Sequence, residues 1–241
     1  MEIVEIGPAQ ALDPLYRDVL APSFPPAELI TLDTLRDGIT RGRISVFAAR
    51  TAGRQDLGAA VGEWFPASRI TVLRYLAARP GARGRGVGAR LLAAARHAWL
   101  RRPAPAAVVA EVEHPAAHTG STAHGDPTAR LRFYARHGAR ALDVPYFQAA
   151  LRPGEPRVYG LLLCLVAATP GLVTDAGFPA DPLARLVRQA LTDTEHAVGS
   201  DPATTALLAA LPPQGRVAVR SLAAPRLLGY SAPAGPVRPP R

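Results

Sequence analysis

Residues 75–92 read YLAARPGARGRGVGARLL, an apolar segment followed by a proline, several glycines and a second apolar segment. The first apolar segment predicts a strand over Ile70–Ala78 that stops at Pro80. The second begins an apolar spacing of three and four residues, which predicts a helix over Gly86–Arg101. Three glycines therefore lie where a strand turns into a helix: Gly84, Gly86 and Gly88.

This glycine-rich turn is a candidate phosphate site. The first N–H groups of a helix have no intrahelical partner and carry the positive end of the helix dipole. Glycines let a ligand approach the backbone closely, and Arg83 and Arg85 add charged donors. The spacing matches neither a Walker loop nor the GxGxxG of a dinucleotide fold. On spacing alone, a strand-to-helix turn without a ligand stays open as the alternative.

Hydrophobic periodicity and turn residues predict the other elements of the first 168 residues. The expected order is β-α-α-β-β-β-α-β-α-β-β, which is an α/β (α+β) arrangement with one mixed sheet flanked by helices. Strands are expected over 2–6, 44–50, 57–65, 70–78, 106–113, 140–151 and 157–168. Helices are expected over 13–20, 27–41, 86–101 and 127–137, the last with Asp126 as its N-cap. Three consecutive strands before the glycine-rich turn exclude a doubly wound nucleotide fold.

The character of the chain changes after residue 168, so residues 1–168 are expected to form one domain. Residues 169–230 form a C-terminal extension that is mainly helical, with helices predicted over Asp181–Ala197 and Pro202–Leu211 and a strand over Gly215–Leu222. Residues 231–241 are rich in proline and predict a flexible, extended tail.

Composition limits the classes of partner. The hydrophobic fraction of 48% allows a sizeable core. The net charge is +9, but all 28 basic residues are arginines scattered along the chain, so we expect no nucleic-acid partner. Cys164 is the one cysteine, which excludes an intrachain disulfide. The N-terminus lacks a signal-peptide pattern and no apolar segment could span a bilayer, so we expect a cytoplasmic protein without a membrane partner.

Two motifs resemble those of the GCN5-related N-acetyltransferase (GNAT) superfamily. Arg83, Gly86 and Gly88 occupy the three defining positions of its motif A, [RQ]xxGx[GA]. Residues 129–139, ARLRFYARHGA, resemble its motif B, with Phe-Tyr followed by the expected glycine, although Ala139 stands where an aromatic residue is usual. The expected order of elements is also that of this superfamily. The resemblance implies a largely antiparallel central sheet with a splayed strand pair.

The resemblance also implies acetyl-CoA as the co-substrate. The backbone of Leu76, Ala77 and Ala78 would bind the pantetheine arm. The pyrophosphate would be held by the loop that follows: Arg83, Gly84, Arg85, Gly86, Val87 and Gly88. Tyr134 matches the tyrosine that protonates the leaving thiolate as general acid in many members; the alternative is that it only packs beneath the cofactor.

The general base is not identified by the motifs. Glu111 and Glu113 lie on the same face of their predicted strand, where they could bind a cationic amine or deprotonate it through water. Glu63 is a third carboxylate within reach of the same cleft. Alternatively, these carboxylates form salt bridges with some of the many arginines.

Three histidines lie beside or within the loop that follows the predicted strand over 106–113: His114, His118 and His124. Pro115 argues against the helix that the spacing of the first two would need to bind a metal, so no metal site is expected and the loop is interpreted as a wall of the acceptor pocket. One of these histidines could serve as base. Cys164 is expected to be buried and inert, which favours direct attack in a ternary complex.

Together, these features predict an N-acetyltransferase that moves an acetyl group from acetyl-CoA to a primary amine, the partner being a small molecule. A non-catalytic sensor or regulatory module that binds acyl-CoA with the same fold is the alternative. The sequence leaves open which amine is used, whether the acyl group is longer than acetyl, and whether the extension covers the acceptor site or forms a homodimer.

Overall fold

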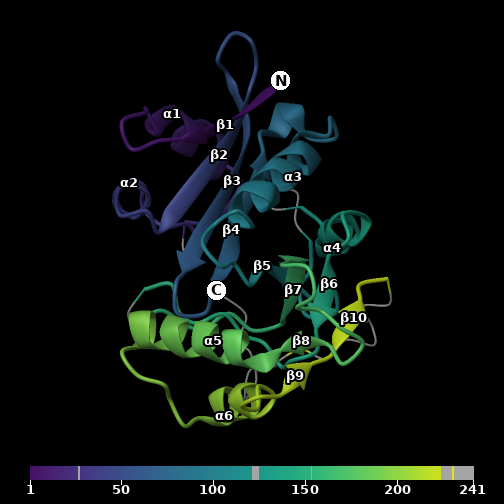
Figure 1. The fold of residues 1–241 in the computed structure, drawn as a ribbon. Coiled ribbons are helices and arrows are strands. Elements are labelled where there is room, and N and C mark those ends of the chain that lie inside the picture. Colours follow the sequence, from purple (N-terminus) through teal and green to yellow (C-terminus); the bar gives the residue numbers. More distant parts are fainter. Residues whose placement is uncertain (27, 121–124, 153, 224–229, 231–241) are drawn as a thin grey trace.

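The protein is built around an eight-stranded sheet with helices on both faces (Figure 1). The computed structural model describes residues 1–241 except 27, 121–124, 153, 224–229 and 231–241, so the predicted proline-rich tail lies outside the described residues. Neighbouring strands are antiparallel except β4 and β5, which are parallel. The spatial order is β1 (Glu2–Ile6), β2 (Ile44–Arg50), β3 (Asp56–Phe65), β4 (Ile70–Ala78), β5 (Ala107–Glu113), β7 (Leu161–Ala168), β6 (Arg140–Leu142) and β10 (Val219–Ser221).

Helices connect these strands in the expected order. Before β2 come α1 (Asp13–Leu15), the π-helical turn η1 (Tyr16–Leu20) and α2 (Leu32–Thr40). After β4 come the short η2 (Pro80–Ala82), α3 (Val87–Trp99) and, beyond β5, α4 (Pro127–Arg136). The extension contributes α5 (Ala180–Glu195), α6 (Pro202–Ala209) and a two-stranded sheet of β8 (Phe178–Pro179) and β9 (Arg216–Val217). The predicted mixed, largely antiparallel sheet flanked by helices is confirmed.

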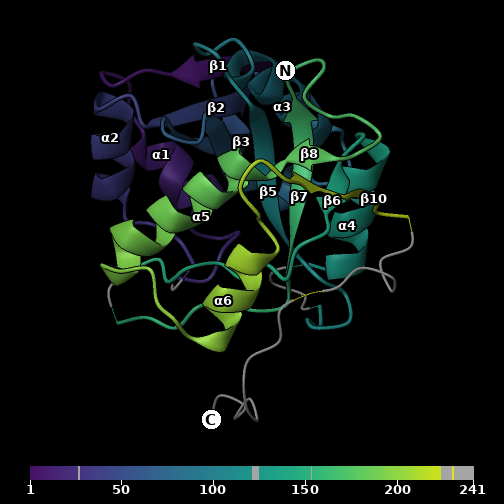
Figure 2. The same cartoon turned by 60° about the horizontal axis from the view of Figure 1, so that its bottom comes forward.

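Strand alternation distributes the apolar side chains between the two faces. Leu73 of β4 points to the core beneath α3 and α4, whereas its neighbour Val72 points to the core beneath α5 and α6. Farther along the same strand, Tyr75 and Ala77 join the core formed by α1, η1 and α2. The sheet therefore has α3 and α4 on one face and shares the other face between the N-terminal helices and the extension (Figure 2).

The C-terminal extension packs directly on the central sheet. Leu183, Leu186, Val187 and Leu191 of α5 are buried in one cluster with side chains of β4, β5 and β7. Burial of each such side chain contributes about 1.5–3 kcal/mol. This apolar stripe fixes α5 across the sheet (Figure 2).

Three predicted elements show the largest differences from the structure. The strand expected over 140–151 ends at Leu142, since Pro145 has no N–H for a ladder, and the chain to β7 is irregular apart from one bridge between Gln148 and Val158. The helix expected from residue 27 begins at Leu32, because Thr31 accepts a hydrogen bond from the backbone N–H of Thr34 and caps the helix there. The strand expected over 215–222 is divided into β9 and β10, which belong to different sheets.

The sheet splits between β4 and β5. These strands pair only from Ile70 with Ala107 to Leu73 with Ala110, and then diverge. At the same point β4 shifts its register against β3, so that Arg74 is an extra residue between Leu73, opposite Gly62, and Tyr75, opposite Val61. The predicted splayed strand pair is therefore present. It leaves one edge of β4 beyond Leu73 unpaired by β5.

Candidate active site

The glycine-rich turn leads into α3 with its first N–H groups uncapped. Gly84 and Gly86 adopt left-handed backbone conformations, with φ of +77° and +76°. Gly86 is the N-cap residue of α3, and no side chain caps the helix there. A Cβ atom at either glycine would meet nothing within 4 Å, so the space above the turn is open. The N–H groups and the exposed side chains of Arg83 and Arg85 thus face solvent, where they can receive an anion.

A groove of about 260 Å³ continues from this turn along the open edge of β4. One wall is the end of β4, and the other is the beginning of α4. Lining residues are Leu76, Ala77, Ala78 and Arg83 on the first side and Asp126, Ala129 and Arg130 on the second. The groove therefore connects the two segments that carry the predicted motifs.

Close packing brings these segments together. A Cβ atom on Gly58 of β3 would lie 2.6 Å from the Ala77 carbonyl oxygen and 2.8 Å from Val87 Cγ1, so only glycine lets α3 begin this close to β4. Phe133 of α4 lies over the first turn of α3, since a Cβ on Gly88 would be 3.6 Å from its ring. The first turn of α3 is thus held between β3 and α4.

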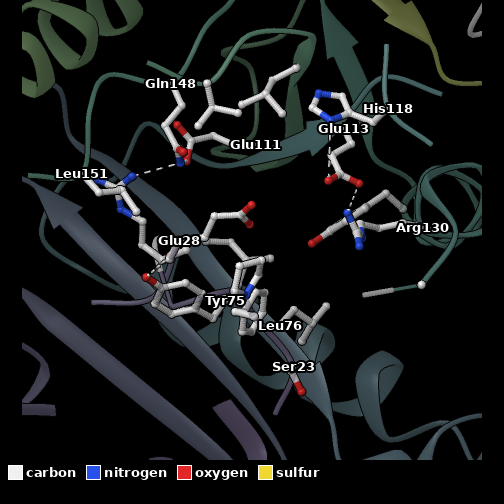
Figure 3. Close-up of a pocket in the computed structure, with 18 of the residues that line it drawn as sticks. Ser23, Glu28, Tyr75, Leu76, Glu111, Glu113, His118, Arg130, Gln148 and Leu151 are labelled. Carbon is white, nitrogen blue, oxygen red and sulfur yellow. Dashed lines mark hydrogen bonds and ion pairs between the residues drawn. The ribbon is translucent and has the colours of Figure 1, made fainter. Parts of the chain in front are cut away.

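The groove opens into a cavity of about 250 Å³ between the diverging strands (Figure 3). Tyr134 of α4 lines this cavity and is buried. Burial raises the pKa of its phenol well above the ordinary value, and Cys164 nearby raises it further. Among the described residues, none forms a hydrogen bond with its hydroxyl group. Tyr134 is therefore a neutral phenol at the cavity wall.

Glu111 lies in the cavity wall with its carboxylate fully engaged (Figure 3). Its Oε1 accepts a hydrogen bond of 2.6 Å from Tyr146 Oη, and its Oε2 accepts one of 2.6 Å from Gln148 Nε2. Arg74, the extra residue of β4, adds a contact of 3.3 Å from Nη1 to Oε2. Burial and the Glu111 carboxylate both raise the pKa of Tyr146. Three donors therefore converge on this one carboxylate.

Arg74 continues this network away from the cavity. Its Nε lies 2.9 Å from Glu63 Oε2, and Arg43 Nη2 lies 2.9 Å from the other oxygen of Glu63. Arg43 in turn lies 3.5 Å from Asp193 of α5. Burial alone would lower the pKa of Arg74, but Glu111 and Glu63 outweigh it and raise that pKa. The chain of charges links the cavity wall to the C-terminal extension.

Glu113 is the second predicted carboxylate, and it points into the cavity beside Glu111, as the period of two along β5 requires (Figure 3). Its Oε2 lies 2.5 Å from Arg130 Nη1 of α4, and its Oε1 lies 3.8 Å from His118 Nδ1. Both predicted carboxylates therefore form salt bridges with arginines, which was the alternative expectation for them.

No family model matches the sequence, and no curated protein matches it. Solved structures do match the fold. A protein described as an acetyltransferase of the GNAT family from Bacteroides thetaiotaomicron has a TM-score of 0.58 and 21% identity, covering 83% of this chain and 100% of its own. The chain has the GNAT fold.

Two enzymes with weaker similarity are among the other matches. The ribosomal-protein-S18-alanine N-acetyltransferase of Escherichia coli has a TM-score of 0.48 and 17% identity, covering 72% of this chain and 99% of its own. Arabidopsis thaliana NAA60, solved with a bisubstrate analogue, has a TM-score of 0.45 and 15% identity, covering 69% and 98%.

Sequence reasoning missed Glu28, whose carboxylate also points into the cavity of this GNAT fold (Figure 3). The segment before α2 is held over the cavity by Tyr75, whose hydroxyl donates to the Glu28 carbonyl and accepts from the Ile30 N–H. Residue 28 was expected inside a helix, so nothing marked it as part of the site. Because α2 begins at Leu32, the segment that contains Glu28 lies outside the helix and covers the cavity.

A second cavity of about 360 Å³ lies behind the Arg74–Glu111 contact. Arg74, Tyr75, Glu111, Gln148 and Leu151 line both cavities and so form the wall between them. The far side is closed by the extension, through three residues of α5: Ala190, Asp193 and Thr194.

Cys164 is fully buried, and burial raises the pKa of its thiol to about 12, which agrees with the inert cysteine expected. His124 lies outside the described residues, and His114 is buried with Nδ1 accepting from the Ala116 N–H.

In the part of the chain that the structure describes, no group of His, Cys, Asp or Glu side chains could hold a metal ion, and no helix is long and apolar enough to cross a membrane.

Proposed function

We propose that this protein is an acyl-CoA-dependent N-acetyltransferase that moves an acetyl group from acetyl-CoA to a primary amine of a small molecule. One observation carries the proposal: the uncapped start of α3 is joined, through the groove along β4, to a cavity that contains a neutral phenol and three carboxylates. The anionic pyrophosphate, the extended pantetheine arm and the reactive thioester of acetyl-CoA would each lie against a matching surface.

The residues along the groove fit acetyl-CoA as a substrate. The pyrophosphate would lie on the N–H groups of residues 84–88, with Arg83 and Arg85 as charged donors. The pantetheine arm would follow the open edge of Leu76, Ala77 and Ala78, where β5 has diverged. A backbone N–H of this edge would polarise the thioester carbonyl, as an oxyanion donor does.

Tyr134 is the proposed general acid. When the amine nitrogen attacks, a C–N bond forms and the C–S bond breaks, so a thiolate leaves. Its phenol is protonated at neutral pH and lines the cavity in which the thiolate would form, so it is placed to donate a proton to the sulfur.

The charges of the cavity favour a cationic acceptor. Among the described residues that line it, Glu28, Glu111 and Glu113 contribute carboxylates, and Arg74 and Arg130 contribute guanidinium groups. Carboxylates at a binding site attract an ammonium group. A cavity of about 250 Å³ also suits a small acceptor better than a large one.

A non-catalytic acyl-CoA sensor of the same fold is the second candidate. It is favoured by the salt bridges of Glu111 and Glu113, because both carboxylates already bind a guanidinium group. The two candidates differ in turnover and agree in binding.

Isothermal titration with acetyl-CoA, followed by a thiol-release assay over a panel of amines, separates these candidates. Replacing both Arg83 and Arg85 by alanine is expected to weaken acetyl-CoA binding about 10- to 100-fold, at about 1.4 kcal/mol for each tenfold step. The matched control replaces Arg101 and Arg188, two exposed arginines after α3 and on α5, and should bind normally. Absence of binding at high micromolar acetyl-CoA would refute both candidates, while binding without turnover of any amine would favour the sensor.

A further inference from the structure

We infer that His118 is the general base that deprotonates the acceptor amine, through its Nδ1 atom. This inference rests on the proposed acetyl transfer. In that reaction the acceptor amine must lose a proton. Both predicted carboxylates are held in salt bridges, so another group has to accept it.

His118 lies at the end of a hydrogen-bonded turn. The backbone N–H of His118 donates to the His114 carbonyl at 3.1 Å, and the His114 N–H donates to the Gly160 carbonyl at 2.8 Å. One helical turn thus forms despite Pro115, since proline fits the first position of a turn. A Cβ on Gly160 would lie 2.5 Å from Ala117 Cβ and 2.9 Å from His118 Nε2, so glycine at this position lets the turn dock before β7.

The docking contact selects the tautomer of the imidazole. His118 Nε2 lies 2.9 Å from the carbonyl oxygen of Tyr159. A carbonyl oxygen only accepts hydrogen bonds, so Nε2 must carry a hydrogen atom. In the neutral ring the lone pair is then on Nδ1, which is the atom that can accept a proton.

This lone pair is on the side of the ring that faces the reaction cavity. His118 lines the cavity together with Tyr134, the proposed acid, and its Nδ1 lies 3.8 Å from Glu113 Oε1 (Figure 3). The side chain is 26% exposed, which leaves it open to an amine or to a bridging water. Acid and base thus come from different elements on one cavity.

Charged and polar groups from four segments of the chain lie around His118. Glu113 of β5 faces Nδ1, the Tyr159 carbonyl before β7 accepts from Nε2, and Glu28 points into the same cavity from the segment before α2. Arg130 of α4 contributes a guanidinium group, which is bound to the other oxygen of Glu113.

The protons balance as follows. Of the three protons of the ammonium group, one goes to His118 Nδ1 and then to solvent, and one remains on the amide nitrogen. The third replaces the proton that Tyr134 Oη gives to the thiolate sulfur. The products are the N-acetylated amine, the free thiol of coenzyme A and one proton.

The first test reads the tautomer without any substrate. In protein labelled with ¹⁵N-histidine, long-range ¹H–¹⁵N spectra should show neutral His118 with hydrogen on Nε2 and none on Nδ1; the His118→Gln variant assigns the signals. Glutamine places an amide N–H near the position of Nε2, so it keeps the contact with Tyr159 and lacks the base. A neutral ring with hydrogen on Nδ1 would overturn the inference.

The second test compares two probe nucleophiles, taking n-butylamine as the protonated amine and hydroxylamine as one that is already neutral at pH 7.5. The His118→Gln variant should lose about 10²–10⁴-fold in kcat/KM with n-butylamine and less than about tenfold with hydroxylamine. His97→Gln, at an exposed histidine of α3, is the control and should match the wild type.

Each remaining result has a defined meaning. Equal losses with both nucleophiles would make His118 a structural or binding residue and overturn the inference, as would full activity of the variant. If the wild type binds no acetyl-CoA or acetylates neither nucleophile, the proposed acetyl transfer itself fails, while the tautomer measurement still stands.

Discussion

Replacing Glu111 with glutamine is expected to destabilise the protein far more than it slows acetyl transfer. Glu111 accepts hydrogen bonds from Tyr146 and Gln148 and faces Arg74. Glutamine has one acceptor oxygen, so if that oxygen keeps the bond from Tyr146, the new amide donors face the donors of Gln148 and Arg74. The side chain is only 9% exposed, so water cannot take the place of the broken hydrogen bonds.

The magnitude follows from the hydrogen bond and the ion pair that the substitution breaks. A hydrogen bond to a charged group contributes about 1.5–3 kcal/mol, and breaking a buried ion pair costs about 3–5 kcal/mol. Arg74 keeps Glu63 as its partner, which reduces the cost, so we expect a loss of about 3 kcal/mol in the free energy of unfolding. For a chain of this size that corresponds to a drop in Tm of about 6–12 °C.

Calorimetry and the thiol-release assay on the same preparation read both effects. Tyr146→Phe is the matched control, because it removes one hydrogen bond to the same carboxylate and leaves its charge in place, and it should cost about 1.5–3 kcal/mol. The expected result for Glu111→Gln is a large fall in Tm with kcat/KM reduced less than about tenfold at a temperature where the variant is folded. An unchanged Tm with a loss of more than about 100-fold in kcat would refute this reasoning and make Glu111 the base.

Two further predictions concern the extension and the pH dependence of stability. Arg157→Ala should lower the free energy of unfolding by about 2–3 kcal/mol, because Arg157 Nη2 lies 2.6 Å from Glu195, its Nη1 lies 2.9 Å from Asp201, and both acids belong to the extension. Limited proteolysis should then cut the extension first, whereas Arg185→Ala, in an exposed pair with Asp181, should change stability by less than about 0.5 kcal/mol. Because burial raises the pKa of Cys164 from 9.0 to about 12, its thiol contributes stability that is fully present below pH 9 and is lost as pH rises toward 12. Denaturant unfolding of the wild type and of Cys164→Ala across this range should show a steeper alkaline loss for the wild type; parallel curves would contradict the shift.

The elements with strong local signals were predicted most accurately. The helix from residue 86 was recognised because its apolar spacing repeats every three to four residues, and the structure has α3 over Val87–Trp99. The Asp126 cap and Pro127 placed the start of α4, and Asp126 accepts from the Thr128 N–H there. The irregular chain from 143 to 160 was predicted poorly, because its apolar residues resemble a strand although its described residues form only one bridge.

In the candidate site, too, only the features that depend on local sequence were predicted. Glu111 and Glu113 could be assigned to one face of a strand because side chains alternate with a period of two. Their arginine partners could not be assigned, since Arg74 is 37 residues from Glu111, and the protein has 28 arginines. Glu28 was missed because its place over the cavity depends on the hydroxyl of Tyr75, 47 residues away.

By itself, the sequence determined what depends on neighbours along the chain: the glycine turn before α3, the phase of each amphipathic helix and the alternation of each strand. Backbone conformation and apolar periodicity are local properties, so they can be read from a few consecutive residues. The tertiary structure alone decided where β4 and β5 diverge and which carboxylates form salt bridges with arginines. It also decided that Asp193 of α5 reaches Arg43, 150 residues away. Those outcomes depend on which of many similar side chains meet when the sheet is assembled, and charge and burial then set what each of them can do.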